Sequence, residues 1–347
     1  MRRILQITIV VVLTVVFVAL FLWNANLRDV WQIMKSANPL WLAVGMFVNW
    51  MALAFRTLRW RIVLNPDDPP PFYATYFANT VGYMLSTILP IRAADVARPA
   101  LLARRTSLRF SGALGTVLIE RLLDLFMILT LFIYFAVVHW NDWSHDPIAA
   151  KWFFIVKGGA IASVAAMAAL SFLIFGIYFF RARIRRLHEY LGRFIPKRFR
   201  EPWMFFFDTF TESFGIVKHH RAFAKILLCT IGVWACLTSQ FWFTAIALGQ
   251  TLPFDASILV TGVTTVGLAI PTPGGIGGFH KACQLVLTNF YHFDIDTSVA
   301  TAILFHIVGT LPVIVTGLIL VALEGLRWRD VKSAVEPDQK AESRKQK

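Results

Sequence analysis

The chain has 347 residues, of which 57% are hydrophobic and only 16% are charged. Its mean hydropathy of +0.62 excludes a water-soluble domain of this size, so we treat it as an integral membrane protein. The net charge of +14 does not indicate nucleic-acid binding, because membrane topology accounts for the basic residues.

Six apolar stretches are long enough to cross hydrocarbon, which takes roughly 20 helical residues. In chain order they are residues 4–22, 40–58, 113–137, 152–180, 222–248 and 299–322. The first resembles a signal peptide, but it is long enough to span and lacks a convincing cleavage site, so we expect a retained helix. Two further stretches, 72–89 and 256–291, are interrupted by proline or glycine. An arrangement of eight transmembrane helices is the alternative if both of them cross.

The distribution of lysine and arginine favours hairpins, because these residues stay on the cytoplasmic side of short loops. If both interrupted stretches return to the side from which they start, the inside segments hold 28 Lys and Arg and the outside segments hold 3. If 72–89 crossed alone, the eleven basic residues of 181–225 would face out. The hairpin arrangement places both termini in the cytoplasm and predicts a multi-pass protein of the plasma (inner) membrane.

The predicted layout occurs twice, with opposite orientation. Residues 1–150 give two helices, a hairpin at 72–104 that starts from the cytoplasm, and a helix. Residues 151–325 repeat this order with a hairpin at 256–291 that starts from outside, and a polar cytoplasmic tail follows at 326–347. Inverted halves with broken helices are a recurring transporter architecture. We therefore predict an all-α membrane protein with six full spans and two re-entrant hairpins in an inverted repeat.

Within the second half, residues 181–220 are predicted to form a cytoplasmic interfacial segment. Aromatic residues from Trp203 onwards fall on one helical face, and Asp208 and Glu212 fall on the opposite face. Because basic residues precede this pattern, we expect the segment to be attracted to anionic lipids.

Each hairpin turns at a proline, Pro90 in the first and Pro271 in the second. Irregular backbone at membrane depth is tolerated only inside protein or beside a wet cavity, so both tips are expected to face a cavity. Glycines near the second tip would let backbone N–H groups approach an anion at the positive end of the following helix. The predicted substrate-binding residues of this tip are Pro273, Gly274, Gly275, Gly277 and Gly278. A plain turn is the alternative.

At the first tip, Arg92, Asp95 and Arg98 are spaced to lie within about one helical turn, and a guanidinium group suits a phosphate. The alternative for such arginines is a cytoplasmic anchor, which we prefer for Arg104, Arg105 and Arg109. His280 and Lys281 complete the predicted substrate site beside the second tip. A histidine in such a place is alternatively a hydrogen-bonded packing residue.

The span 113–137 contains Glu120, Arg121 and Asp124, and the last span contains His306. Ionisable groups at this depth are costly and normally face an interior or a cavity. We predict that they form either an ion pair between the halves or the lining of a cavity. The sequence contains no HExxH or Asp-rich diphosphate motif, and we expect no catalytic residue, no metal and no cofactor. "RAADVARP" only partly matches a lipid phosphatase motif, which makes that activity a weaker alternative.

Five stretches resemble, in order and spacing, the lysylphosphatidylglycerol synthase transmembrane-region family. They are LRWRIVL (58–64), LPIRAADVARPALLARR (89–105), ERLLDL (120–125), IPTPGGIGGFHKA (270–282) and FHIVGTLPVIVTG (305–317). This flippase-like domain also occurs in stand-alone membrane proteins of the UPF0104 type and in archaeal relatives tied to dolichol-linked glycan assembly.

The resemblance implies a lipid-translocating domain and not an enzyme. About 20 residues follow the last helix, so we expect no aminoacyl-transferring domain. The family usually has an acidic residue where His280 stands and an arginine where His306 stands, so both charges of a pair are replaced together. We expect transport of an anionic phospholipid or a polyprenyl-phosphate-linked lipid, with anionic lipids and lipid or glycan biosynthesis enzymes as partners. A membrane scaffold for such an enzyme is the alternative.

Overall fold

A computed structural model describes residues 2–88, 94–108, 110–139, 147–179, 190, 219–268, 270 and 272–325. Within these residues every regular element is helical and none is a strand. The α-helices are α1 (Arg2–Leu22), α2 (Leu27–Ser36), α3 (Pro39–Leu64), α4 (Phe72–Ile88), α5 (Ala94–Ala103), α6 (Phe110–Val138), α7 (Pro147–Phe179), α10 (His220–Ala247), α11 (Phe254–Gly267), α12 (Gly278–Phe290) and α13 (Ile295–Leu323), and η2 (Pro273–Gly275) is a 3₁₀ turn. The chain is an all-α membrane protein, as its composition predicts.

Each of the six long apolar stretches forms one helix, namely α1, α3, α6, α7, α10 and α13. In the described residues α3, α6, α10 and α13 are long and apolar enough to cross a membrane. α1 and α2 together make a fifth candidate, although the chain bends by 79° between them. The bend contains Asn24, whose φ of 64° lies in the left-handed region. The exact number of spans remains a prediction.

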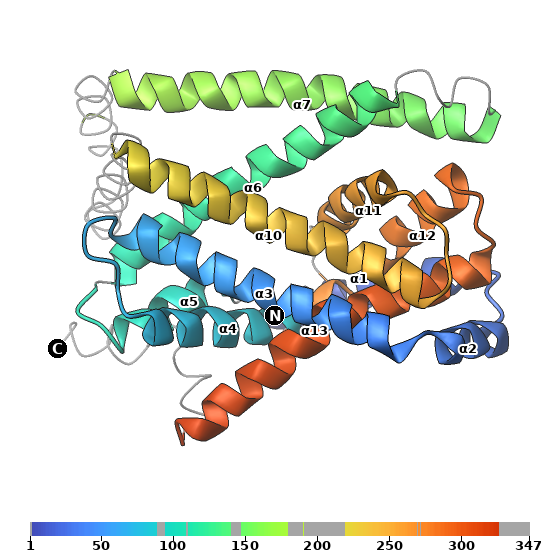
Figure 1. Ribbon diagram of the computed structural model, residues 1–347, viewed down its shortest axis with the longest axis horizontal. Coiled ribbons are helices and arrows are strands. Elements are labelled where there is room, and N and C mark those ends of the chain that lie inside the picture. Colours follow the sequence, from blue (N-terminus) through green and yellow to red (C-terminus); the bar gives the residue numbers. More distant parts are fainter. Residues whose placement is uncertain are drawn as a thin grey trace.

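Both interrupted stretches form pairs of short helices. α4 ends at Ile88 and α5 begins at Ala94, whereas α11 ends at Gly267 and α12 begins at Gly278. α11 and α12 cross so closely that a Cβ on Gly267 would lie 2.7 Å from the Gly278 carbonyl oxygen. Only a residue without a side chain fits such a crossing. Figure 1 shows α4 and α5 on one side of the bundle and α11 and α12 on the other.

One end of the bundle, which we call the α5 end, is fixed by Glu324 just after α13. Tyr73 near the start of α4 donates its hydroxyl hydrogen to Glu324 at 2.7 Å, and Arg105 just after α5 lies 2.9 Å from the same carboxylate. The hydrogen bonds from Arg105 and Tyr73 lower the pKa of Glu324. The α4–α5 hairpin therefore begins and ends beside the C-terminal end of α13.

The opposite end, which we call the α2 end, contains the start of α13. There the Asn26 N–H donates to Asp296 Oδ1 at 2.7 Å, and the Asn38 N–H donates to the Ala247 carbonyl oxygen at 2.7 Å. α11 starts shortly after Ala247, and α12 ends shortly before α13 begins. The two hairpins therefore enter the bundle from opposite ends. The inverted relation of the two halves and their orientation in the membrane remain predictions.

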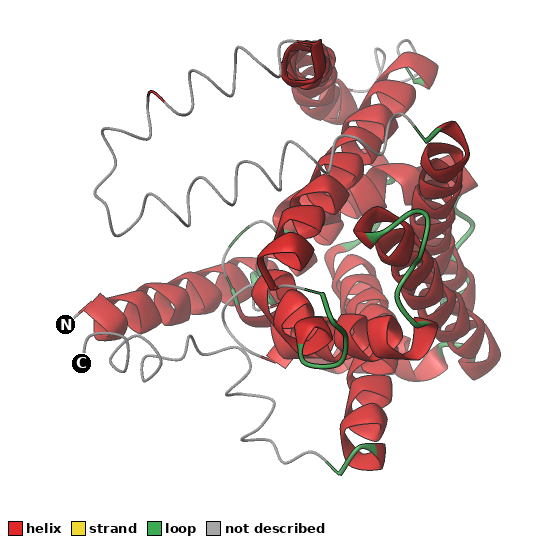
Figure 2. Ribbon diagram, turned by 90° about the vertical axis from the view of Figure 1, so that its left-hand side faces the viewer, coloured by secondary structure: helices red, strands yellow, loops and turns green. Residues whose placement is uncertain are grey.

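α3 and α10 pack side by side through the middle of the bundle (Figure 1). Asn49 on α3 donates to Gln240 Oε1 on α10 at 2.6 Å, so a buried amide pair fixes the register of the two helices. α1 projects sideways from the body of the bundle towards the N-terminus (Figure 2).

Several predicted features lie outside the described residues. These are the first tip with Pro90 and Arg92, Pro271 at the second tip, Arg109, nearly all of the interfacial segment 181–220, and the tail 326–347.

Candidate functional site

Three helices bring six charged side chains together, a group that we call the charge cluster. Its members are Arg59 on α3, Asp95 and Arg98 on α5, and Glu120, Arg121 and Asp124 on α6. Glu120 and Asp124 are four residues apart, so they lie on one face of α6. Asp95 and Arg98, two of the residues predicted for the first tip, thus meet the charged residues predicted in the span 113–137.

The buried half of the charge cluster is built around Arg59. Its Nε lies 3.1 Å from Glu120 Oε1, and its Nη1 lies 2.7 Å from Asp124 Oδ1. Arg98 approaches the other oxygen of the same glutamate, with Nη2 at 2.6 Å from Glu120 Oε2. The side chains of Arg59, Arg98 and Glu120 are 0%, 1% and 2% exposed. Glu120 therefore joins two buried guanidinium groups.

The outer half of the charge cluster is more open. Arg121 hydrogen-bonds Asp95, with its Nε 3.1 Å from Asp95 Oδ1, and its Nη1 lies 3.9 Å from Asp124 Oδ2. Arg121 and Asp95 are 42% and 31% exposed. The cluster contains three arginines and three carboxylates, so its formal charges balance. Balance is required at this depth, because an unpaired charge in a low-dielectric interior is very costly.

Aromatic rings and a glycine shape the surroundings of Arg98. Its Cζ lies 4.4 Å from the ring centre of Trp60 and 5.0 Å from that of Tyr83. Gly82 on α4 leaves space for this side chain, because a Cβ there would lie 2.3 Å from Arg98 Cγ. Cation–π contacts of this kind are strongest where water is excluded. A second guanidinium group approaches Tyr83, with Arg56 Cζ 4.9 Å from the ring centre.

The glycine loop between α11 and α12 meets the end of α4. Gly274, Gly275 and Gly277 have φ values of 59°, 75° and 90°, in the left-handed region that favours glycine. A Cβ on Gly274 would lie 2.9 Å from the Thr87 carbonyl oxygen, and one on Gly277 would lie 2.6 Å from Phe17 Cβ on α1. Protein atoms therefore fill the space beside these glycines, and the last described turn of α4 touches the tip of the other hairpin.

Several N–H groups of the loop are already bonded within it. The Gly275 N–H donates to the Thr272 carbonyl oxygen at 3.1 Å, and the Ile276 N–H donates to that of Pro273 at 3.0 Å. The buried Gly278 lies where α11 and α12 cross. An anion would bind here only after these bonds rearrange, so the loop is closed in this conformation.

The buried His280 and the half-buried His306 form a pair directly beneath the loop. The Gly277 N–H donates to His280 Nδ1 at 3.3 Å, so the hydrogen of a neutral His280 is on Nε2. That Nε2 lies 3.2 Å from Nδ1 of His306, which must then accept. A further hydrogen bond joins His306 to the backbone of Gly274. The loop and the two rings thus form one chain of hydrogen bonds.

α4 connects the charge cluster to the glycine loop. Tyr83 contacts the cluster, and Thr87, one turn further along α4, contacts Gly274. The Thr87 hydroxyl donates to the Tyr83 carbonyl oxygen at 3.1 Å. Arg98, which is ion-paired to Glu120, contacts α4 at Tyr83, whereas the glycine loop contacts it one turn later at Thr87. The structure therefore does not place Arg98 directly against the glycine loop.

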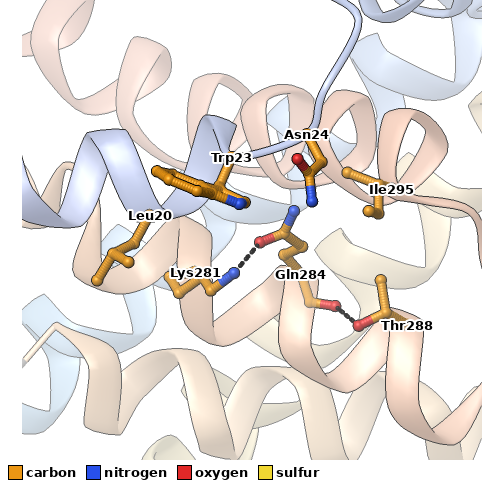
Figure 3. Close-up of a pocket in the computed structure, with 7 residues that line it drawn as sticks. All are labelled: Leu20, Trp23, Asn24, Lys281, Gln284, Thr288 and Ile295. Atoms are coloured by element: carbon orange, nitrogen blue, oxygen red, sulfur yellow. Dashed lines mark hydrogen bonds between the residues drawn. The ribbon is translucent and has the colours of Figure 1, made fainter.

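Lys281 does not join the histidine pair. Its Nζ donates to Gln284 Oε1 at 2.7 Å in a separate pocket between α1 and α12 (Figure 3). Neighbouring residues on a helix point about 100° apart, so His280 and Lys281 face different elements.

The sequence analysis missed Arg59 as a site residue. It was counted among the basic residues of a cytoplasmic segment, whereas α3 continues to Leu64 and buries it completely. A signal was present, because the stretch LRWRIVL continues the apolar pattern on both sides of this arginine. In the part of the chain that the structure describes, no group of three or more His, Cys, Asp or Glu is placed to hold a metal ion.

The sequence profile of one family, described as the lysylphosphatidylglycerol synthase TM region, matches residues 4–331. A UPF0104 membrane protein of Methanothermobacter thermautotrophicus is 22% identical over 305 residues, which cover 80% of this chain and 81% of that protein. The glycosyltransferase AglD of Haloferax volcanii is 22% identical over 339 residues, which cover 90% of this chain. This chain covers 54% of AglD, so it spans about half the length of that relative.

Proposed function

Because the chain belongs to the lysylphosphatidylglycerol synthase TM-region family, we propose that it moves a lipid between the two leaflets of its membrane. The cargo is a lipid with an anionic head group, either a phospholipid or a polyprenyl-phosphate-linked lipid. No covalent bond changes in this process, so the protein acts as a transporter and not as an enzyme.

One observation carries this proposal, namely the contact between the two interrupted hairpins. They come from opposite ends of the bundle, and Thr87 in one lies against Gly274 in the other. Transporters built from broken helices bind their substrates where such elements meet, because half-helix ends and freed backbone groups are available there. Here polar groups lie on both sides of the contact, the charge cluster on one side and the pair of His280 and His306 on the other.

The composition of the charge cluster also supports transport. A buried ion pair is weak evidence for stability, because apolar residues of similar volume often replace it without loss. An anionic head group could exchange with one of these ion pairs, because its phosphate would take the place of Glu120 beside Arg98. Glu120 would keep Arg59 as its partner, so neither carboxylate nor phosphate would be left without a positive neighbour.

In this mechanism the two hairpins separate and come together in turn. When they separate, the hydrogen bonds within the glycine loop break, and the lipid phosphate passes between Arg98 and the freed N–H groups of the loop. The sequence also places Arg92 six residues before Arg98, which is why we include it in the proposed binding site. The distribution of Lys and Arg supports an orientation with both termini in the cytoplasm and a location in the plasma membrane.

The alternative is a membrane scaffold or accessory subunit for an enzyme of lipid or glycan biosynthesis. The name of the AglD relative, a glycosyltransferase about half of which this chain covers, favours it. Such a protein would bind lipid or an enzyme without moving lipid across the membrane.

Transport is tested with the purified chain in liposomes that carry fluorescent phosphatidylglycerol, phosphatidylethanolamine or a short polyprenyl phosphate. A membrane-impermeant quencher reports how fast each lipid changes leaflet. We expect accelerated exchange of one anionic lipid, and loss of that exchange in Arg98→Gln and Gly275→Leu. Gly249→Ala is the matched control for the glycine, because Gly249 also has a positive φ but has open space around it.

All variants are first checked for a single folded species by size-exclusion chromatography. If the wild-type chain binds anionic lipid but exchanges none of the three lipids, the transport proposal is wrong and the scaffold is favoured.

A further inference from the structure

A mainly apolar pocket with one charged side chain, Lys281, lies at the α2 end of the bundle, away from the charge cluster. We propose that it holds the phosphate of the anionic lipid when the lipid is in the leaflet at that end. This inference rests on the proposed function for the identity of the lipid, but binding to the pocket is measurable without transport.

The pocket has a volume of about 400 Å³ and lies between α1, α12 and the start of α13. It is lined by Leu20, Trp23, Asn24, Lys281, Gln284, Thr288 and Ile295. Figure 3 shows Lys281 and Gln284 extending towards each other from α12, with Trp23 and Asn24 above them at the end of α1. Its volume lies within the range of roughly 300–1,000 Å³ that is usual for small-ligand sites.

Lys281 supplies the charge of the pocket. Its Nζ donates to the neutral Gln284 amide oxygen at 2.7 Å, and no carboxylate of the described residues lies within 4.0 Å of it. An ammonium group has three hydrogens to donate, so a single neutral acceptor leaves both donors and charge available. Lys281 is half-buried, and a half-buried cation beside an apolar wall is stabilised by a counter-charge. An anionic ligand would provide it.

Gln284 fixes the position of that charge. It is 2% exposed, and its Nε2 donates to the Phe21 carbonyl oxygen at 3.1 Å while its Oε1 accepts from Lys281. Both ends of the amide are therefore used, which sets its orientation. Gln284 is a positioning residue: it ties α12 to α1 and directs the ammonium group into the pocket.

The surroundings favour a lipid phosphate over a free one. Trp23 at the mouth of the pocket is 67% exposed, and tryptophan prefers the membrane–water interface, where lipid phosphates lie. Three residues of α1, Val12, Val16 and Leu20, are spaced four apart and are 53%, 46% and 45% exposed. They form an apolar stripe that ends at the pocket, which suits acyl chains attached to a phosphate beside Lys281.

Binding is tested with the full chain in phosphatidylcholine nanodiscs, titrated with short-chain fluorescent phosphatidylglycerol. We expect Lys281→Met to weaken binding roughly tenfold, the effect of losing one charge-assisted hydrogen bond. Lys281→Arg should retain most of the affinity. Lys35→Met removes an exposed lysine from the same end of the bundle and should change nothing.

Equal affinity of Lys281→Met and Lys35→Met would overturn the proposed pocket. Glycerol 3-phosphate, which has no acyl chains, is added as a water-soluble competitor of the fluorescent lipid. If it displaces the probe as well as unlabelled phosphatidylglycerol does, the site binds a free phosphate and the lipid assignment is wrong. Leaflet exchange is measured on the same samples. Binding that depends on Lys281 but is not accompanied by exchange would uphold the pocket and contradict transport. Exchange accompanied by binding that does not depend on Lys281 would uphold transport and contradict the pocket.

Discussion

Arg59 provides the sharpest test of the charge cluster. Its guanidinium group is fully buried, and it contacts Glu120 at 3.1 Å and Asp124 at 2.7 Å. Replacement by methionine keeps a long side chain of apolar character but removes the charge. Glu120 would still have Arg98, whereas the cluster as a whole would have one carboxylate more than it has arginines.

Breaking a buried ion pair by removing one partner costs about 3–5 kcal/mol, because the other charge stays buried without compensation. A loss of 1 kcal/mol lowers the Tm by roughly 2–4 °C in domains of 150–250 residues and by about 1.5 °C in a chain of 347 residues, so Arg59→Met should lower the Tm by roughly 4–8 °C. Arg61→Met is the matched control from the same helix. Arg61 is half-buried, and among the described residues it donates to the Pro70 carbonyl oxygen and lies over the Phe72 ring at 5.8 Å, so its loss should cost about 1 kcal/mol.

The double variant Arg59→Met/Asp124→Leu separates electrostatics from packing. It leaves Arg98 with Glu120 and Arg121 with Asp95, so the remaining charges balance. We expect the double variant to be more stable than Arg59→Met alone, as measured by thermal unfolding of the purified protein in one detergent. A Tm of Arg59→Met within about 2 °C of that of Arg61→Met would refute the reasoning, as would a double variant less stable than the single one.

Three further predictions concern the loop, the α5 end and the histidine pair. Gly277→Ala should displace α1 and lower the Tm, because its Cβ would overlap α1, whereas Gly249→Ala, also at positive φ, should cost less; equal losses would contradict the packing explanation. Two hydrogen bonds lower the pKa of Glu324, so Tyr73 and Arg105 should stay bonded to its carboxylate at pH values above the ordinary carboxylate pKa. These contacts should be lost as the pH falls through the lowered pKa of Glu324. Hydrogen exchange at the end of α13 should show this acid-induced opening in the wild type and not in Glu324→Gln. His280→Asp/His306→Arg should be more stable than the sum of its single variants predicts, by about 1 kcal/mol in a double-mutant cycle of unfolding, because the new carboxylate and guanidinium would lie where the two rings meet; additivity would contradict a direct contact between the two positions.

The helices were the most predictable part of the molecule. Apolar length located each of the six long helices, and the proline and glycine interruptions located both hairpins. These features are local, since a run of apolar residues forms a helix in lipid whatever its neighbours are.

The partners of the charged residues were less predictable. Near the end of α3 the sequence offers Arg56, Arg59 and Arg61, and topology alone treats them alike. Which of the three is buried depends on the rotation of α3 relative to α6. A local sequence pattern does not determine that rotation. Glu120 and Asp124 were predicted to share a face, and the structure supplies Arg59 and Arg98 as the residues opposite.

The prediction for the second tip shows a similar limit. The sequence indicates that its glycines permit a close approach, but it does not say what approaches. In the structure the approaching groups are Thr87 of α4 and Phe17 of α1. Likewise Lys281 follows His280 in sequence, but the two side chains face different neighbours on α12.

The central claim is that the contact between the two hairpins must open for lipid to cross, and a disulfide across that contact tests it most directly. A Cβ on Gly274 would lie 3.8 Å from Thr87 Cγ2, which is close to where the sulfur of a cysteine at position 87 would lie, so a disulfide requires a small backbone shift. Because the same Cβ would lie 2.9 Å from the Thr87 carbonyl oxygen, the reduced double variant is first compared with the wild type, and the oxidised protein is then compared with the reduced one. Thr87→Cys/Gly274→Cys is made in a chain whose native cysteines are replaced by alanine, namely Cys229, Cys236 and Cys283. We expect oxidation to stop lipid exchange in liposomes and reduction to restore it. Equal exchange rates in the fully oxidised and the reduced protein would contradict the account.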